Sequence, residues 1–366
     1  MSRVAIPAEA AKLLAPLADE ARMRGTPLYA VGGPVRDWLL KRPNFDVDLT
    51  VAGPPDPVAE AAARLLGGTV ETFGRFGTRR VVSKGKFRVD VATTRAESYP
   101  APAALPVVDA TGVPIERDLF RRDFTVNAMA VRLDGGSREL VDPYGGLRDL
   151  KAKVVRVLHP ASFRDDPTRV FRAARFMGRL KYAAAPGLVD AAKAALPHAA
   201  GLSPHRLLHE LDCLLGEKDP GPAFDLLKKW GYLRLLGSPG WTAGLPVGVE
   251  ERLAALALRA KDGKAFVDAF PHEHKRRARL HAVLELAFSD KAPRTPPEPS
   301  VAAAVKRFAP KANLKACYLT GADLIAAGLQ PGPAFHKLLD EAARLQRAGK
   351  LRTRAAALAW LENHAA

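Results

Sequence analysis

The chain has 366 residues, 48% of them hydrophobic and 26% charged, which is the composition of a globular protein large enough for two or more domains. Lysine and arginine outnumber aspartate and glutamate by 56 to 39, and the net charge of +17 predicts a polyanionic partner such as nucleic acid, with a merely basic protein as the alternative. The sequence lacks an apolar run of about 18 residues, which argues against a membrane span, and its two distant cysteines, Cys213 and Cys317, favour a reducing, cytoplasmic setting. No obligate protein partner is evident from the sequence.

The first predicted elements are a helix and two short strands. Residues 8–24 form an amphipathic pattern that carries acids and lacks a cleavage site, so they predict a helix and not a signal peptide. Apolar runs at 28–31 and 45–51 predict strands, and the second contains Asp46 and Asp48. Because side chains alternate along a strand, both carboxylates point the same way. Such a pair suits Mg²⁺. A plain polar strand face is the alternative, although aspartate is a poor strand former.

A glycine pair separates these two strands and begins a short predicted helix. Gly32 and Gly33 let the backbone approach a ligand closely, and unpaired amides at a helix start favour an anion. Arg36, one turn further on, can hold a phosphate through two hydrogen bonds. A glycine pair alone is usually a turn. A phosphate cradle and a carboxylate pair in one strand-turn-helix-strand unit nevertheless suggest nucleotidyl transfer.

The next segments predict another helix, at 57–66, and β-structure at 69–82 and 87–92. The last of these, FRVDVA, places Asp90 among apolar residues. In a hairpin arrangement Asp90 stands beside the first two carboxylates as a third one, and a simple acidic strand end is the alternative. Residues 93–116 are rich in Pro, Ala and Gly, so we expect a long loop with little local structure, and such loops are often functional.

Two dense charged blocks follow the loop. In RDLFRRDFTVNAMAV, Arg122 and Asp123 stand against a predicted helical run that carries Asn127. Taken alone, this block is typical of a helix N-terminus with a cluster of solvent-exposed charges. The second block, FRDDPTRVFRAARF, predicts a helix because proline suits a first turn.

Within the second block, Asp166 and Arg169 are three residues apart and are expected to share a helix face, as are Arg169 and Arg172, and Arg172 and Arg175. An aspartate beside an arginine offers an acceptor and a donor fork together, which can read the Watson–Crick edge of a base. An intrahelical ion pair is the commoner use of this spacing.

The rest of the chain predicts helices. A basic cluster lies on one of them and is expected to follow an RNA backbone, with a solvated helix face as the alternative; its members are Lys275, Arg276, Arg277 and Arg279. His272 and His274 are expected to be ordinary surface residues and not metal ligands. The run TPPEP at 295–299 predicts a linker.

The chain resembles a known family in several of these motifs. GGPVRD followed by DVD, then RRDFTVNAMA and then RDDPTRVFRAARF resemble the signature of class II nucleotidyltransferases, which include CCA-adding tRNA nucleotidyltransferases and bacterial poly(A) polymerases. The resemblance covers most of the chain and is weakest over 238–310. Asp165 stands where the family has glutamate, and His205 stands where it has an acid, so the resemblance assigns neither a role.

The resemblance implies a role for each candidate residue. It implies catalysis by Asp46, Asp48 and Asp90, with Mg²⁺ held by the first two. It implies nucleotide binding by Gly32, Gly33, Arg36, Arg122, Asp123, Asn127, Asp166, Arg169, Arg172 and Arg175. In the family, the loop at 93–116 is linked to the final A-addition, and enzymes that add only CC tend to lack it, which argues against that narrower activity.

The sequence as a whole predicts an α+β fold. We expect a polymerase-β-type head with a mixed five-stranded sheet at 1–150, then a helical neck (151–215), body (216–290) and tail (291–366), the last binding tRNA. The resemblance implies addition of CMP and AMP from CTP and ATP to the 3′ end of tRNA, with two Mg²⁺ ions and release of pyrophosphate. An A-adding enzyme, a poly(A) polymerase and a non-catalytic RNA-binding relative remain alternatives.

Overall fold

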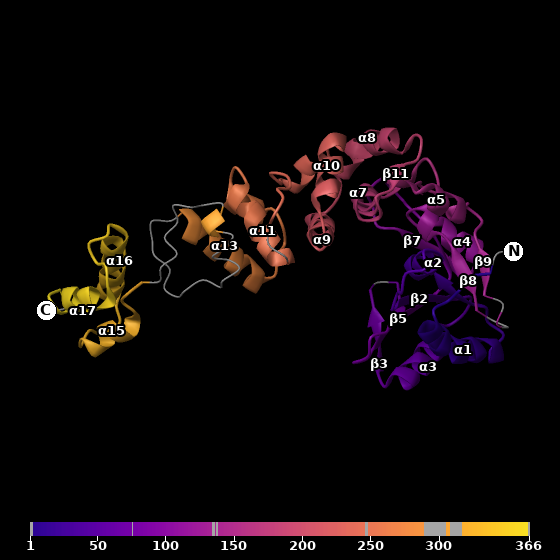
Figure 1. The fold of residues 1–366 in the computed structure, drawn as a ribbon, viewed down its shortest axis with the longest axis horizontal. Helices are drawn as coiled ribbons and strands as arrows, with labels where there is room; N and C mark the ends of the chain where they lie inside the picture. Colours follow the sequence, from indigo (N-terminus) through magenta and orange to yellow (C-terminus); the bar gives the residue numbers. More distant parts are fainter. Residues whose placement is uncertain are drawn as a thin grey trace. The chain divides into compact units, whose positions relative to one another are not determined.

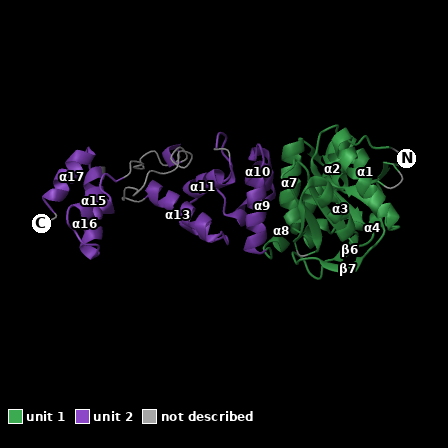
Figure 2. Cartoon of the chain, turned by 90° about the horizontal axis from the view of Figure 1, so that it is seen from below, with its two compact units in different colours: residues 1–202 green, residues 203–366 purple. Residues whose placement is uncertain are grey.

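The fold is that of a computed structural model, which describes residues 3–74, 76–133, 136, 138–245, 248–288, 305–307 and 317–364. The chain divides into two compact units, residues 1–202 and 203–366 (Figure 2). The expected linker at 295–299 lies outside the described residues. In the described ranges, every helix is too short or too polar to cross a membrane.

A mixed sheet forms the centre of the first unit. Its strands lie in the order β3-β4-β5-β2-β1-β8-β9. Their bounds are β1 (Leu28–Val31), β2 (Asp46–Val51), β3 (Thr69–Phe73), β4 (Thr78–Val82), β5 (Arg88–Thr93), β8 (Ala130–Arg132) and β9 (Glu139–Val141). Only β2 and β5 pair in parallel; the other pairs within this described sheet are antiparallel. The α+β class is confirmed, but the sheet has seven strands and not the expected five, because the chain after the RRDF block adds β8 and β9 beside β1.

Helices cover the sheet where its side chains are apolar. Their bounds are α1 (Ala8–Met23), α2 (Gly33–Leu39), α3 (Asp56–Leu66), α4 (Ile115–Phe120) and α5 (Gly146–Ala152). The helices α1 and α3 lie side by side (Figure 1), and α3 packs against β3, β4 and β5. The buried side of α1 carries Leu13, Leu14 and Leu17. Burying leucines of this kind stabilises the fold by about 1.5–3 kcal/mol each. This layer holds the strands that carry the site.

The segment expected to be a loop at 93–116 is ordered. It forms a hairpin of β6 (Arg95–Ser98) and β7 (Val107–Thr111), and α4 begins soon after it. The expectation of little local structure is therefore wrong. The Pro, Ala and Gly content of the whole segment obscured two short strands: RAES has weak β-propensity, and VVDAT, which contains strand-favouring valine and threonine, is only five residues long.

The first unit ends in a helical part. It comprises β10 (Val154–Val155), α6 (Ser162–Asp165), α7 (Thr168–Leu180), β11 (Ala183–Ala184) and α8 (Leu188–Ala199); a 3₁₀ turn, η1 (Thr125–Asn127), lies earlier in the chain, between α4 and β8. The strands β10 and β11 pair in parallel. One face of α7 is buried through Val170, Phe171 and Ala174, so its arginines are held on a fixed helix.

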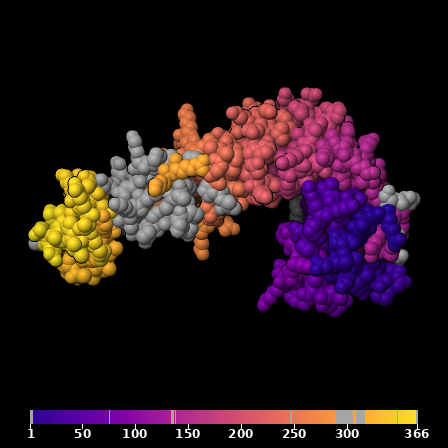
Figure 3. Space-filling view, in the orientation of Figure 1, coloured from indigo at the N-terminus to yellow at the C-terminus, as the bar shows by residue number. Residues whose placement is uncertain are grey.

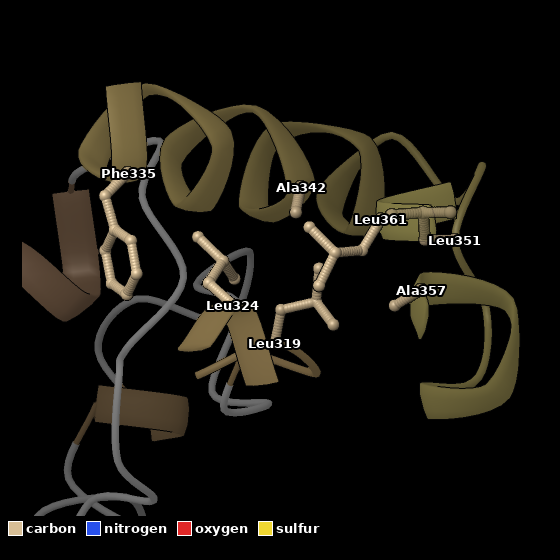
Figure 4. Close-up of a cluster of buried hydrophobic side chains, with 7 residues drawn as sticks. All are labelled: Leu319, Leu324, Phe335, Ala342, Leu351, Ala357 and Leu361. Carbon is tan, nitrogen blue, oxygen red and sulfur yellow. The ribbon is translucent and has the colours of Figure 1, made fainter. Parts of the chain in front are cut away.

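The second unit is helical in the part that the structure describes. Its elements are α9 (Pro204–Leu215), α10 (Gly221–Trp230), η3 (Tyr232–Leu236), α11 (Val249–Arg259), α12 (Gly263–Asp268), α13 (His274–Phe288), α15 (Gly321–Ala326), α16 (Pro333–Arg347) and α17 (Arg354–Glu362). The last three helices pack together, and their atoms, coloured from orange to yellow, form one cluster in the space-filling view (Figure 3). Their core contains Leu324, Phe335 and Leu361 (Figure 4).

Candidate active site

Three carboxylates lie on adjacent strands. Asp46 and Asp48 are on β2, and Asp90 pairs with Asp48 on β5. The stretches at 69–82 and 87–92 form an antiparallel hairpin through β4 and β5, as expected, and β5 also pairs in parallel with β2, which brings Asp90 beside the pair. Arg80 donates to both oxygens of Asp90, at 2.8 and 2.7 Å. Asp46 is exposed, and one of its oxygens lies 3.3 Å from Nε of Arg88.

Asp48 carries the least compensated charge of the three. Burial raises its pKa to about 6; Arg122 opposes this shift, and the negative charges of Asp90 and Asp46 add to it. Its carboxylate makes no hydrogen bond within the described part of the chain. A buried carboxylate beside like charges favours binding a cation.

The donor set fits a magnesium ion. Among the described residues, no group of three or more His, Cys, Asp or Glu side chains forms a complete metal site. Mg²⁺ does not need one, because it is usually held by one or two carboxylates together with waters and substrate phosphates. Asp46 and Asp48 supply two carboxylates on one strand face, and the raised pKa of Asp48 shows that the protein leaves its charge poorly balanced.

The turn between β1 and α2 requires a glycine at Gly32. Its φ is +74°, and a Cβ there would lie 3.0 Å from Nη1 of Arg122. The Gly32 amide donates to the Met129 carbonyl at 3.1 Å, so this amide is not open to a ligand as the sequence led us to expect. Arg36 is buried, and its Nη1 donates to Oδ1 of Asn127 at 2.7 Å. The absence of a side chain at Gly32 therefore leaves space for the guanidinium of Arg122.

Asp123 joins the RRDF motif to α7. Its Oδ2 accepts from Nε and Nη2 of Arg172 at 2.9 and 2.6 Å, and its Oδ1 accepts from Nδ2 of Asn127 at 3.0 Å. Burial alone would raise the pKa of Asp123, but Arg172 and Asn127 together lower it. The ionised carboxylate therefore fixes both partners. Asn127 lies in the 3₁₀ turn η1, and not in the expected longer helix, because the chain passes directly into β8.

A second buried aspartate positions the two arginines of the same motif. Asp118 accepts from Nη2 of Arg121 at 2.9 Å and from Nη2 of Arg122 at 3.0 Å. Its side chain is fully buried; burial would raise its pKa, and Arg122 and Arg121 reverse that shift. Asp118 therefore stays ionised and forms ion pairs with both Arg121 and Arg122.

Asp166 and Arg169 lie on either side of the start of α7. Asp166 is an extended residue, with φ −133° and ψ 91°, and its carboxylate accepts from the amide and hydroxyl of Thr168 at 3.1 and 2.6 Å. The helix begins only after Pro167, so the three-residue spacing does not place Asp166 on a shared helix face, and that expectation is wrong. Arg169 is buried, with 4% of its surface exposed.

These motifs line one cavity of about 550 Å³ in the first unit. The expected site residues in its wall are Gly32, Gly33, Arg36, Asp46, Asp48, Arg122, Asp123, Asn127, Asp166, Arg169 and Arg172. Asp90 and Arg175, also expected, are not part of this wall. Residues that the prediction left out are Pro34, Asp37, Asn44, Glu97, Tyr99, Arg121, Phe176 and Arg179.

Three arginine side chains lie close to one aromatic ring, that of Phe176, in the cavity wall. The Cζ atoms of Arg36, Arg172 and Arg179 lie 5.4, 5.7 and 4.7 Å from the centroid of the Phe176 ring. A guanidinium over an aromatic face is attracted to the ring and can still donate hydrogen bonds from the N–H groups at its edge. Arg179 is seven residues after Arg172, which is about two helix turns, so this spacing would have indicated it.

The basic cluster of the second unit is mostly paired within the protein. Arg276 binds Asp212 through two hydrogen bonds of 2.7 and 2.6 Å, Arg277 donates to the Phe270 carbonyl at 3.0 Å, and Arg279 donates to Glu250 at 2.6 Å. Lys275 is exposed. The cluster is therefore not the uniform basic face that the sequence suggested.

The two histidines near this cluster differ. His272 is buried, with 7% of its surface exposed, so the expectation of a surface residue is wrong for it. Burial and the nearby charge of Arg276 lower its pKa. His274 is exposed, as expected.

Comparison with known proteins identifies close relatives of this chain. Residues 28–156 match the poly(A) polymerase head domain. The CC-adding tRNA nucleotidyltransferase of Deinococcus radiodurans is 35% identical over 354 residues, which are 92% of this chain and 90% of that protein. The A-adding tRNA nucleotidyltransferases of Geobacter sulfurreducens and Halalkalibacterium halodurans are 42% and 40% identical, and the chain spans only 24% and 51% of their lengths.

Solved structures show the same fold. An apo CCA-adding enzyme aligns over the full length of both chains with a TM-score of 0.69 and 26% identity, and a CCA-adding enzyme in complex with ATP aligns with a TM-score of 0.70 and 25% identity. Together with the relative that matches nearly end to end, these similarities show that the chain belongs to the tRNA nucleotidyltransferase and poly(A) polymerase family.

Proposed function

We propose that this chain adds CMP and AMP from CTP and ATP to the 3′ end of tRNA and so builds or repairs the CCA terminus. One observation carries the proposal: a single cavity contains an under-compensated carboxylate pair, a wall of arginines and the Asp166–Arg169 pair. Transfer of a nucleotidyl group needs a metal site, a triphosphate site and a base site, and this wall offers residues suited to each.

The carboxylate pair is the proposed metal site. Asp46 and Asp48 would hold Mg²⁺, which would polarise the α-phosphate and lower the pKa of the attacking 3′-hydroxyl. The carboxylates themselves fix the place on β2 where this chemistry occurs. Asp90 orients Arg80 and adds negative charge beside Asp48, so its contribution to catalysis is through that neighbour.

The arginines are the proposed triphosphate site. Arg36, Arg172 and Arg179 surround Phe176, and Arg122 lies over Gly32. Guanidinium groups bind phosphate oxygens in pairs and keep their charge at any physiological pH. They neutralise the triphosphate and stabilise the departing pyrophosphate, and Asn127 and Asp123 keep two of them in place.

The base site is proposed at the start of α7. Cytosine and adenine both present an amino group next to a ring nitrogen that accepts a hydrogen bond. The carboxylate of Asp166 can accept from the amino group, and the guanidinium of Arg169 can donate to the ring nitrogen. Uracil and guanine present a carbonyl and an N–H in these places, so an acceptor would face an acceptor and a donor would face a donor, which is unfavourable in a buried site.

Addition of CC alone is the second candidate. One relative that matches this chain nearly end to end, from Deinococcus radiodurans, is a CC-adding enzyme. The long segment between β5 and α4 argues for the wider activity, on the family pattern given above. Addition of A alone and poly(A) addition are narrower alternatives for the same site.

One assay separates these activities from one another and from non-catalytic RNA binding. Purified protein is given labelled CTP or ATP with tRNA transcripts that end before the CCA, after the first C, or after CC. Full CCA addition predicts CTP incorporation on the first two transcripts and ATP incorporation on the third. A CC-adding enzyme leaves the third transcript unextended, an A-adding enzyme extends only the third, a poly(A) polymerase adds repeated AMP, and a binding protein extends none.

A further inference from the structure

Three acceptors from different segments hold the guanidinium of Arg169. Its Nη1 donates to Oγ of Ser162 at 2.6 Å, and its Nη2 donates to the Arg121 carbonyl at 2.8 Å and to the Tyr99 hydroxyl at 3.1 Å. A guanidinium is planar and rigid and has five N–H groups. Three hydrogen bonds from both terminal nitrogens fix its plane and leave the remaining N–H groups, including the one on Nε, for another acceptor.

Tyr99 supplies one of these acceptors from the cavity wall. It follows β6 directly and is half-buried, and its ring centroid lies 5.6 Å from Cζ of Arg169. Burial is the main cause that raises its pKa, so the phenol stays protonated at neutral pH. The hydroxyl can therefore accept from Arg169 through a lone pair while it keeps its own proton to donate.

The segment that carries Tyr99 is itself fixed. Across the hairpin, Oγ of Ser98 donates to Oδ1 of Asp109 at 2.7 Å. A few residues later, the Ala103 amide donates to the Asp165 carbonyl at 3.2 Å. The chain from 98 to 103 thus contacts both ends of the proposed base site, through a side chain at Arg169 and through the backbone just before Asp166.

We propose that Tyr99 is a positioning residue for base selection, which aims the Arg169 guanidinium at the ring nitrogen of an incoming cytosine or adenine nucleotide. The inference rests on the proposed function, because it concerns how the same cavity discriminates between nucleotides. A guanidinium that can tilt would meet the carbonyl of uracil or guanine more easily. Loss of the hydroxyl should therefore affect the ratio between nucleotides more than the rate with the correct one.

Two variants that each remove a single hydroxyl give a matched test. Tyr99→Phe removes the contact to Arg169, whereas Tyr144→Phe removes a hydrogen bond to the Glu116 carbonyl away from the cavity wall. The readout is kcat/KM for CTP, ATP, UTP and GTP on tRNA transcripts without CCA or ending in CC. We expect the preference for CTP over UTP to fall about three- to tenfold in Tyr99→Phe and to stay at the wild-type value in Tyr144→Phe.

A double-variant experiment separates positioning from a direct or structural effect. If Tyr99 acts through Arg169, Tyr99→Phe causes no further change in nucleotide ratios in an Arg169→Ala background. Ser162→Ala, which removes another acceptor of the same guanidinium, should shift the ratios in the same direction as Tyr99→Phe. An equal additional shift in the Arg169→Ala background contradicts the inference.

The inference and the proposed function fail in different ways. A wild-type protein that incorporates no nucleotide overturns both. An active wild type, together with a Tyr99→Phe variant of unchanged melting temperature and unchanged nucleotide ratios, overturns the role of Tyr99 and leaves the proposed function standing.

Discussion

Asp48 and Asp90 face each other on parallel strands, yet only Asp90 has an arginine bonded to its carboxylate. Arg80 lies on the next strand in register with Asp90, so the row across β4, β5 and β2 is arginine, aspartate, aspartate. The carboxylate of Asp48 makes no hydrogen bond to the described residues, and its pKa is raised to about 6. The carboxylate charge of Asp90 is therefore compensated within the protein and that of Asp48 is not, although the two residues look alike in the sequence.

Substitution of these acids should separate a metal ligand from a residue that orients its neighbour. Asp48→Asn and Asp46→Asn should each abolish nucleotide incorporation, because an amide lacks the charge that holds Mg²⁺. Asp90→Asn should retain measurable activity and lose about 1–3 kcal/mol of stability, because Arg80 is left without its ionic partner. Incorporation rates and unfolding free energies of the three variants test this difference. Near-normal turnover in Asp46→Asn or Asp48→Asn would refute the metal assignment.

The pKa of Asp48 predicts opposite effects of pH on Mg²⁺ binding and on the stability of the metal-free protein. At a Mg²⁺ concentration below saturation, Mg²⁺ binding should weaken as the pH falls below about 6, because a proton competes with the metal for Asp48. Without metal, the folded pKa lies above the unfolded value, so the folded state binds the extra proton between about pH 4 and 6. The contribution of Asp48 to the free energy of unfolding therefore becomes less unfavourable as the pH falls through that window.

The matching control for this effect is Asp48→Asn. In metal-free buffer at pH 8 the variant should be more stable than wild type, by about 1–3 kcal/mol, and the difference should vanish near pH 4. Added Mg²⁺ should raise the melting temperature of wild type more than that of the variant. A variant that is less stable than wild type at pH 8 would show that Asp48 is compensated by the protein.

Two neighbouring basic residues of helix α13, Arg276 and Lys275, should respond differently to substitution. Arg276→Gln breaks a half-buried bidentate pair with Asp212, so it should lower the melting temperature. Lys275→Gln removes an exposed charge and should weaken tRNA binding without a stability loss. If Lys275 contacts a duplex phosphate, the slope of log affinity against log salt becomes shallower by about 0.9. An unchanged slope would place the RNA path elsewhere on the protein.

The sequence predicted local units better than their three-dimensional relations. The pattern at 28–31 and the alternation around Asp48 correctly indicated β1 and β2, because both depend on neighbouring residues. The parallel pairing with Asp90 could not be read in this way, since it results from the path of the chain through β3 and β4. The two short strands β6 and β7 were missed because β6 has weak β-propensity and β7 is a five-residue run within a segment rich in Pro, Ala and Gly.

For the candidate site, too, the sequence predicted local motifs better than contacts between distant residues. Motif spacing found most of the cavity wall, but it treated Asp166 as helical because Pro167 marks the helix start only within a margin of a residue or two. Tyr99 had no motif signal, since its hydrogen bond to Arg169 crosses 70 residues of sequence. The sequence also did not indicate the acidic partners of Arg276 and Arg279. These two arginines look like part of a basic cluster in the sequence, but both form ion pairs in the structure.

The proposed base site makes a prediction about the excluded nucleotides. The enzyme should incorporate CTP and ATP with a higher kcat/KM than UTP and GTP. Asp166→Ala or Arg169→Ala should reduce this discrimination, expressed as a free energy, by about 1–3 kcal/mol, if each lost contact resembles other base-edge contacts. A purely structural role for these residues predicts lower stability and unchanged ratios. Relative incorporation of all four nucleotides, with melting temperatures measured in parallel, distinguishes the two.

The most direct test of the whole account is stepwise extension of one tRNA transcript that lacks its CCA end, with the four labelled nucleotides supplied singly and together. We predict that CTP alone adds two residues, that ATP adds one residue only after them, that UTP and GTP add none, and that Asp48→Asn extends nothing. Failure of the wild-type protein to extend the transcript, or incorporation of all four nucleotides at similar rates, would contradict it.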